Sequence, residues 1–281
     1  MKKYLKLIVS AAAIGLVLAG CGQSEASSKD KKAEPTTVKL GVVGDDTRVW
    51  DDVAKRLEKE GITIEITKFA DYNQPNQALA DESIDLNSFQ HQFFLDTFNE
   101  EHGTDLVSIG NTVNAPLGIY SDQIKDVKEL ENGAKIAIPN DVTNGGRALL
   151  LLQSADLIKV DPSKKQTPTV SDVTENKLNL DIQELDASQT ARALQDVDAS
   201  VINSGVAVDA GFVPTQDAIF LEPVDESSKP YVNIIVARKE DVDNKTYQKI
   251  VDAYQTDETK KVIEETSKGS SIPSWETFGR K

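Results

Sequence analysis

Aromatic residues gather in one stretch of the chain, Asp71–His102. Five of the eight Phe residues lie in or beside it. Tyr72, Phe89 and His91 would together offer a flat apolar wall, which suits a thioether through sulfur–aromatic contact. A lone His beside a helix start more often makes a structural hydrogen bond, so both roles stay open for His91. Phe94 and Phe98 stand four residues apart on a predicted helix, and we assign them to the core.

A second informative segment is Asn144-Gly145-Gly146-Arg147. Small residues at a helix start leave backbone N–H groups open to an anion, and the helix dipole adds to the attraction. Arg147 contributes a planar, bidentate donor that matches a carboxylate. A turn with a surface arginine explains the segment equally well.

Three asparagines stand at positions where a site could use them. Asn144 lies at a helix start, Asn203 ends a predicted strand, and Asn233 interrupts an apolar strand. An amide inside an apolar strand must find hydrogen-bond partners. Three amides that converge could bind the ammonium and carboxylate of a zwitterion without adding net charge.

Catalytic signatures are absent from the sequence. It contains no G-x-x-x-x-G-K-[ST], G-x-S-x-G, H-E-x-x-H or G-x-G-x-x-G segment. Two His and one Cys supply few zinc ligands. We therefore expect no enzyme activity, no metal site and no cofactor.

Length and charge narrow the class of protein further. A chain of 281 residues is long for one core and comfortable for two lobes. Its net charge of −15 disfavours nucleic-acid binding, because such a surface repels phosphates. We expect a monomer.

The N-terminus has the parts of a bacterial signal peptide. Lysines precede an apolar run, residues 7–19, that is too short to span a membrane comfortably. Leu18-Ala19-Gly20-Cys21 resembles a lipobox, which implies cleavage after residue 20 and lipidation of Cys21. A secretory leader that happens to end near a free thiol is the alternative. Residues 21–37 lack large apolar side chains and predict a flexible tether, which favours a Gram-positive cell surface.

Alternating strand and helix patterns follow the tether. The segments 38–43, 49–57 and 62–67 predict a strand, a helix and a strand, hence a parallel right-handed unit. Further predicted elements are a helix over 75–80, a strand over 84–86, a helix over 92–101, a strand over 106–109 and an extended segment over 116–120.

The pattern restarts in the second half of the chain. Predicted strands cover 135–138, 178–182, 199–202, 219–221 and 231–237, and predicted helices cover 149–152, 189–196, 246–255 and 257–267. We place lobe 1 at 38–120 and 230–281, and lobe 2 at 121–229.

Several separated segments resemble one family, the NlpA-type methionine-binding lipoproteins that serve an ATP-driven amino-acid importer. They are Tyr72-Asn73-Gln74-Pro75-Asn76-Gln77-Ala78-Leu79, Ile84-Asp85-Leu86-Asn87-Ser88-Phe89-Gln90-His91, Ile138-Pro139-Asn140-Asp141-Val142-Thr143-Asn144-Gly145-Gly146-Arg147, Val201-Ile202-Asn203 and Pro230-Tyr231-Val232-Asn233. The resemblance implies an α/β, two-lobed fold of the periplasmic-binding-protein type (type II), with two crossovers between the lobes and a ligand enclosed between them.

The resemblance also implies roles for the residues singled out above. Tyr72, Phe89 and His91 would surround a methionine side chain. Arg147 with Asn144 would hold the carboxylate, and Asn203 with Asn233 would hold the amino-acid head group. The protein would be a lipid-anchored solute-binding protein outside the cytoplasm that delivers L-methionine to an ABC permease and its ATPase.

One segment departs from the family pattern. Many methionine binders have a tyrosine three positions after the residue that matches Asn203, whereas this chain has Ser204-Gly205-Val206. The smaller segment could widen the pocket, so a methionine-containing dipeptide, D-methionine or another apolar amino acid stays open as the ligand. A surface interaction lipoprotein with a vestigial pocket is the alternative from another class.

Overall fold

The computed structural model describes residues 36–281. The predicted signal peptide, Cys21 and most of the predicted tether lie outside this part of the chain. Thr36 and Thr37, predicted as the end of the tether, are instead the first residues of strand β1, where they pair with Ile62 and Thr63. No helix among the described residues is long and apolar enough to cross a membrane.

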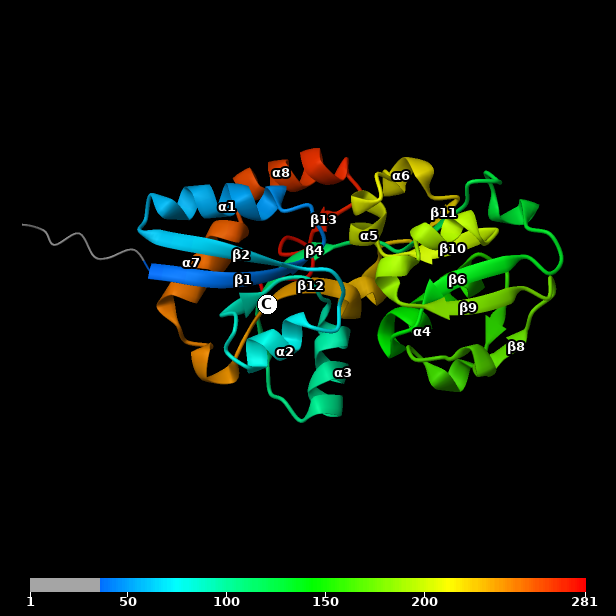
Figure 1. Ribbon diagram of the computed structural model, residues 1–281, viewed down its shortest axis with the longest axis horizontal. Coiled ribbons are helices and arrows are strands. Elements are labelled where there is room, and N and C mark those ends of the chain that lie inside the picture. Colours follow the sequence, from blue (N-terminus) through cyan, green and yellow to red (C-terminus); the bar gives the residue numbers. More distant parts are fainter. Residues whose placement is uncertain (1–35) are drawn as a thin grey trace, which may run out of the picture. The chain divides into compact units, whose positions relative to one another are not determined.

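A six-stranded mixed sheet organises the first half of the fold (Figure 1). Its strands, in spatial order, are β13 (Ile272–Pro273), β4 (Val107–Asn114), β12 (Val232–Ala237), β3 (Leu86–Asn87), β1 (Thr36–Val43) and β2 (Ile62–Phe69). β1 pairs in parallel with both β2 and β3, which confirms the predicted parallel unit. β12 and β4 run antiparallel to their neighbours.

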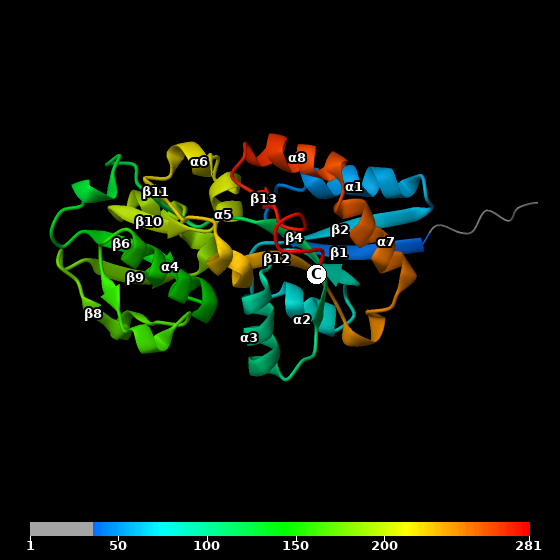
Figure 2. The same cartoon turned by 180° about the vertical axis from the view of Figure 1, so that it is seen from behind.

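Helices cover both faces of this sheet (Figure 2). The helices α1 (Arg48–Glu58), α7 (Lys245–Tyr254) and α8 (Asp257–Ser267) pack on one side, and α2 (Pro75–Ala80) and α3 (Gln92–His102) on the other. β12 shows the consequence: Ile235 and Ala237 join the core under α1 and α7, while Ile234 and Val236 join the core under α3. A strand buried on both faces reads as a continuous apolar run, which explains the composition of this segment.

A five-stranded sheet organises the second half. Its order is β11 (Phe220–Leu221), β5 (Gly118–Tyr120), β10 (Ala199–Ile202), β6 (Lys135–Pro139) and β9 (Asp181–Leu185). Helix α4 (Val142–Ser154) packs on it, and β7 (Lys159–Val160) with β8 (Val173–Glu175) forms a small hairpin. Two short helices, α5 (Ser204–Asp209) and α6 (Pro214–Asp217), follow β10.

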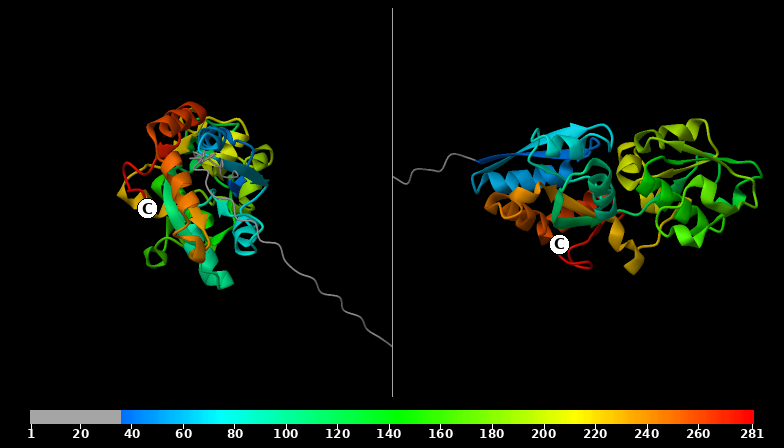
Figure 3. Two further views of the ribbon diagram at one scale, coloured as in Figure 1. Left: turned by 90° about the vertical axis from the view of Figure 1, so that its left-hand side faces the viewer. Right: turned by 90° about the horizontal axis from the view of Figure 1, so that it is seen from below.

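The chain passes between the two sheets twice. It leaves the six-stranded sheet after β4 to enter β5, and it returns from β11 to β12 through the 3-10 helix η6 (Glu226–Tyr231). The two-lobed α/β fold with two crossovers is therefore confirmed. Figure 3 shows the two sheets from the side and from below. β5 belongs to the five-stranded sheet, because it pairs with β10 and β11, although we had placed it in lobe 1.

Two predicted elements of the second lobe differ from the structure. The strand predicted over 178–182 begins only at Asp181. The predicted helix over 189–196 is a pair of 3-10 turns, η4 (Ala187–Gln189) and η5 (Arg192–Gln195). The Thr190 carbonyl accepts a hydrogen bond from Ser200 Oγ at 2.8 Å, so it is engaged outside the helix. In an α-helix the Leu194 N–H would donate to this carbonyl, whereas here it donates to the Ala191 carbonyl, as in a 3-10 turn.

Both tryptophans of the chain lie in the first lobe. Trp50 of α1 packs against Tyr254 of α7, with 4.8 Å between ring centroids. Trp275 meets the same tyrosine from another side, edge to face, at 5.8 Å. This cluster closes the end of the core beneath α1, α7 and α8.

Candidate functional site

A cavity of about 200 Å³ lies where the two sheets face each other. Val43 is the last residue of β1, Ser88 follows β3, and Asn203 follows β10, so the carboxyl ends of parallel strands converge on it. All seven residues predicted to bind a ligand line this cavity: Tyr72, Phe89, His91, Asn144, Arg147, Asn203 and Asn233. The structure therefore brings the predicted set together, and their roles in binding stay a prediction.

Three aromatic rings form one wall of the cavity. Tyr72 and Phe89 have ring centroids 5.9 Å apart, and Phe94 meets both rings edge to face, at 6.2 and 5.8 Å. Phe94 lines the cavity, so its assignment to the core was wrong. Both side chains lie on the same face of α3, but Phe94 is in its first turn, beside the cavity, whereas Phe98 lies one turn further along and packs in the core.

His91 is the N-cap of α3. Its Nδ1 accepts a hydrogen bond from the Phe94 backbone N–H at 3.0 Å, so the ring proton must sit on Nε2. Nε2 faces Asn144 Oδ1 at 3.5 Å. Burial and the nearby Arg147 charge lower the pKa of His91 to about 3. The imidazole is therefore neutral at physiological pH, and it serves both a structural and a cavity-lining role.

A relay of amides fixes the orientation of Asn203. The Asn144 side-chain N–H donates to both carboxylate oxygens of Asp141 at 3.0 Å. Asn203 Nδ2 in turn donates to Asn144 Oδ1 at 2.8 Å. Asn203 Oδ1 is left buried without a hydrogen-bond partner among the described residues. A buried acceptor without a partner is costly, so this oxygen is suited to a donor from a ligand.

The start of α4 differs from the open anion site that we predicted. α4 begins at Val142 and is capped by Asp141, whose carboxylate accepts from the Asn144 backbone N–H at 2.9 Å. The two glycines serve packing instead. A Cβ on Gly145 would lie 2.8 Å from the Pro139 carbonyl oxygen, and one on Gly146 would lie 2.6 Å from the carbonyl oxygen of Gln166.

Arg147 is buried and held from several directions, not exposed on a turn. Its Nε donates to Glu222 Oε1 at 2.9 Å, and its Nη2 donates to Glu222 Oε2 and to the Ala115 carbonyl. The guanidinium carbon lies 4.3 Å from the centroid of the Tyr231 ring. Among the described residues no hydrogen bond uses Nη1, so its two N–H groups are free for a ligand.

Asn233 lies opposite His91, with which it forms an isolated β-bridge. The neighbouring Ile234 backbone N–H donates to the Gln90 carbonyl at 3.0 Å. Beneath this contact, buried Asn76, Asn87 and Gln90 exchange side-chain hydrogen bonds. The amide cluster anchors the segment that carries Phe89 and His91.

Sequence reasoning missed four contributors: Phe94, Asp141, Glu222 and Tyr231. Asp141 could have been found as an N-cap, since it precedes an apolar helical pattern. Glu222 gave no local signal, because it lies 75 residues from the arginine that it binds.

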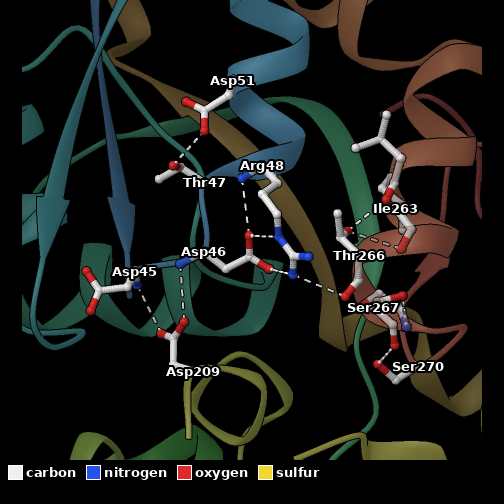
Figure 4. Close-up of polar contacts among 12 residues, drawn as sticks. Asp45, Asp46, Thr47, Arg48, Asp51, Asp209, Ile263, Thr266, Ser267 and Ser270 are labelled. Carbon is white, nitrogen blue, oxygen red and sulfur yellow. Dashed lines mark hydrogen bonds and ion pairs between the residues drawn. The ribbon is translucent and has the colours of Figure 1, made fainter. Parts of the chain in front are cut away.

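The rim of the cavity carries contacts between the two lobes (Figure 4). Asp209, at the end of α5, accepts from the backbone N–H groups of Asp45 and Asp46 at 3.1 and 3.2 Å. Within the first lobe, Arg48 binds the Asp46 carboxylate, and its Nη2 donates to the Thr266 carbonyl at 3.2 Å. Gly44 makes room for Asp209, because a Cβ on Gly44 would overlap Asp209 Oδ2. The φ of Gly44, +90°, also favours glycine there.

A second cavity of about 760 Å³ adjoins the first. The two share Val43, Tyr72, Val206 and Asp209. Within residues 36–281, no cluster of three or more His, Cys, Asp or Glu could hold a metal ion.

Two α/β lobes joined by two crossings, with a small polar and aromatic cavity where they meet, define the class of periplasmic-type solute-binding proteins. The model of the NlpA lipoprotein family matches residues 38–275. The chain belongs to the NlpA lipoprotein family.

Individual relatives agree with this assignment. The probable D-methionine-binding lipoprotein MetQ of Vibrio cholerae is 43% identical over 279 residues, which cover 98% of this chain and all of the relative. A nutrient-binding protein from Burkholderia cenocepacia, solved with bound methionine, is 45% identical, with a TM-score of 0.81 over 84% of this chain and 99% of that one. The substrate-binding protein of a methionine transporter from Streptococcus pneumoniae is 44% identical, with a TM-score of 0.81 over 85% and 96% of the two chains.

Proposed function

We propose that this protein binds methionine between its lobes, with the L-isomer as the ligand, and delivers it to an ABC importer. The observation that carries the proposal is that one cavity contains both a hydrogen-bond donor and a hydrogen-bond acceptor that have no partner among the described residues. Arg147 offers free N–H groups on Nη1 to a carboxylate, and Asn203 offers an unpaired oxygen to an ammonium. Tyr72, Phe89 and Phe94 offer aromatic surface to a thioether.

The size of the cavity supports a single amino acid. Its volume of about 200 Å³ lies below the roughly 300–1,000 Å³ that drug-sized ligands occupy. The methionine bound to the Burkholderia relative and the transporter of the Streptococcus relative support the same ligand and role. The Vibrio relative's name supports D-methionine as the competing ligand.

Calorimetry with purified protein tests the ligand. We expect L-methionine to bind more tightly than D-methionine, glycyl-methionine and norleucine. If one of the other three ligands bound more tightly, that ligand would take the place of L-methionine in the proposal. If no amino acid or dipeptide raised the melting temperature, an interaction lipoprotein would be favoured, because a ligand that binds the native state must stabilise that state.

Two variants test the assignment of the cavity. Arg147→Ala should lower the affinity for methionine by at least tenfold, because the carboxylate loses its charge-assisted donor. Phe89→Ala should weaken methionine more than a small polar amino acid. Equal losses for both ligands would remove Phe89 from contact with the side chain.

The anchor is proposed on the sequence, since Cys21 lies outside the described residues. We propose that a lipid on Cys21 holds the protein on the outer face of a cell membrane, on the surface of a Gram-positive cell. Cys21→Ala should shift the protein from the detergent phase to the aqueous phase of a whole-cell extract and should abolish labelling with palmitate. Retained labelling would contradict the assignment.

A further inference from the structure

Arg147 and Glu222 form a buried ion pair directly behind the cavity. The side chains are 4% and 16% exposed. Glu222 does not line the cavity, whereas Arg147 does. The carboxylate binds one edge of the guanidinium, formed by Nε and Nη2, and leaves Nη1 for the cavity. The pair thus presents hydrogen-bond donors to a ligand while it cancels the charge that would otherwise accompany them.

The other residues that line the cavity add little charge, and the Asp141 carboxylate lies behind Asn144, whose side-chain amide binds both of its oxygens. His91 is neutral because burial and Arg147 lower its pKa. Asn144, Asn203 and Asn233 are amides. Asp209 also lines the cavity, but it is exposed to solvent and its oxygens accept from backbone N–H groups of the opposite lobe. Solvent screens such a charge far better than it screens a buried one.

We propose that Glu222 determines the charge selectivity of the site: by neutralising Arg147, it makes the cavity accept a zwitterion and reject a monoanion of the same shape. This inference rests on the proposed function. A ligand with a carboxylate and no ammonium would bring an uncompensated negative charge beside Glu222, and it would leave Asn203 Oδ1 without a donor.

Glu222 also has a structural role that the test must separate from its charge. Its Oε2 accepts from the Leu117 backbone N–H at 3.0 Å, and its backbone N–H donates to the Leu117 carbonyl at 2.9 Å. These bonds join the two segments that pass between the lobes. Glu222→Gln keeps a side-chain oxygen for Leu117 and removes the charge. Glu222→Asp keeps the charge and shortens the side chain.

Calorimetry with three ligands of nearly equal shape tests the proposal: methionine, its des-amino analogue 4-(methylthio)butanoate, and methioninamide. They are a zwitterion, an anion and a cation. In Glu222→Gln we expect the affinity for the anion to rise about tenfold relative to methionine, and that for the cation to fall by a similar factor. Glu222→Asp should keep the wild-type ranking. Glu226→Gln, an exposed change of the same net charge on η6, should also keep it.

The outcomes separate the two proposals. If wild-type protein does not bind methionine, the proposed function fails. If wild type binds methionine but Glu222→Gln weakens all three ligands by one factor, Glu222 has only a structural role and this inference is wrong. The inference is also wrong if Glu222→Gln binds the anion, 4-(methylthio)butanoate, no more tightly than Glu222→Asp does.

Discussion

At the scale of single residues, Phe94 and Phe98 have different roles although both lie on α3. Phe94 lines the cavity with Tyr72 and Phe89, whereas Phe98 is 8% exposed and packs in the core with Leu95. Phe98→Ala should lower the free energy of unfolding by about 3–5 kcal/mol, because it leaves a hole in the core.

Phe94→Ala should instead lower the affinity for methionine and change the free energy of unfolding less than Phe98→Ala. Denaturant titration and calorimetry on both variants check the contrast. A larger loss of stability in Phe94→Ala than in Phe98→Ala would return Phe94 to the core.

His91 makes stability depend on pH. Its pKa in the fold, about 3, lies below the ordinary 6.5. Between these values the unfolded chain binds a proton that the folded chain does not, so stability falls as the pH falls from about 6.5 toward 3. His91→Gln removes this contribution. From pH 7 to pH 5, wild type should lose about 2 kcal/mol more unfolding free energy than the variant. If the unfolding free energies of wild type and His91→Gln fell in parallel with pH, the imidazole of His91 would accept a proton in the folded protein as well.

At the scale of elements, the packing of α4 on β6 requires a glycine. A Cβ at Gly145 would lie 2.8 Å from the Pro139 carbonyl oxygen, which belongs to the backbone and cannot move freely. Gly145→Ala should therefore lower the free energy of unfolding by about 1–3 kcal/mol. Gly205→Ala in α5 is the matched control, since a Cβ there has open space and should cost nothing in the ligand-free protein. Equal stability of the two variants would show that α4 can shift away from β6.

Local patterns predicted the elements well and the contacts between them poorly. The alternation of Ile62, Ile64 and Ile66 predicted β2, and the apolar spacing at Val49, Val53 and Leu57 predicted α1, because one buried face imposes the period. The 3-10 turns at 187–195 were missed because their contacts involve distant residues, such as the bond from Ser200 Oγ to the Thr190 carbonyl, which no local pattern marks.

For the candidate site too, single residues were easier to predict than contacts between distant segments. Residues whose type was informative by itself, such as Arg147 and Asn233, were found from the sequence, with the family resemblance directing attention to the asparagines. Glu222 was missed because nothing near it in the chain marks it. It gains its role only when the crossing segment after β11 lies against α4.

At the scale of the whole molecule, α5 connects the cavity to the contact between lobes. Asn203 is the residue directly before α5, and Asp209 at the end of α5 binds the loop after β1. Asp209→Asn weakens these charge-assisted bonds, so we expect methionine to dissociate about threefold to tenfold faster, with a smaller change in the association rate. Stopped-flow measurement checks this. Asp196→Asn, an exposed change of equal charge, is the control. An unchanged dissociation rate would mean that the contact of Asp209 between the lobes does not slow the release of methionine.

The packing of Trp50 and Trp275 around Tyr254 decides what intrinsic fluorescence can report. Both indoles lie in the core of the first lobe, and neither lines the candidate cavity. Tryptophan emission should therefore follow the unfolding of that lobe and respond weakly to methionine. Phe212→Trp would place an indole in the wall of the adjoining cavity, beside α5, where emission can respond to a ligand bound between the lobes.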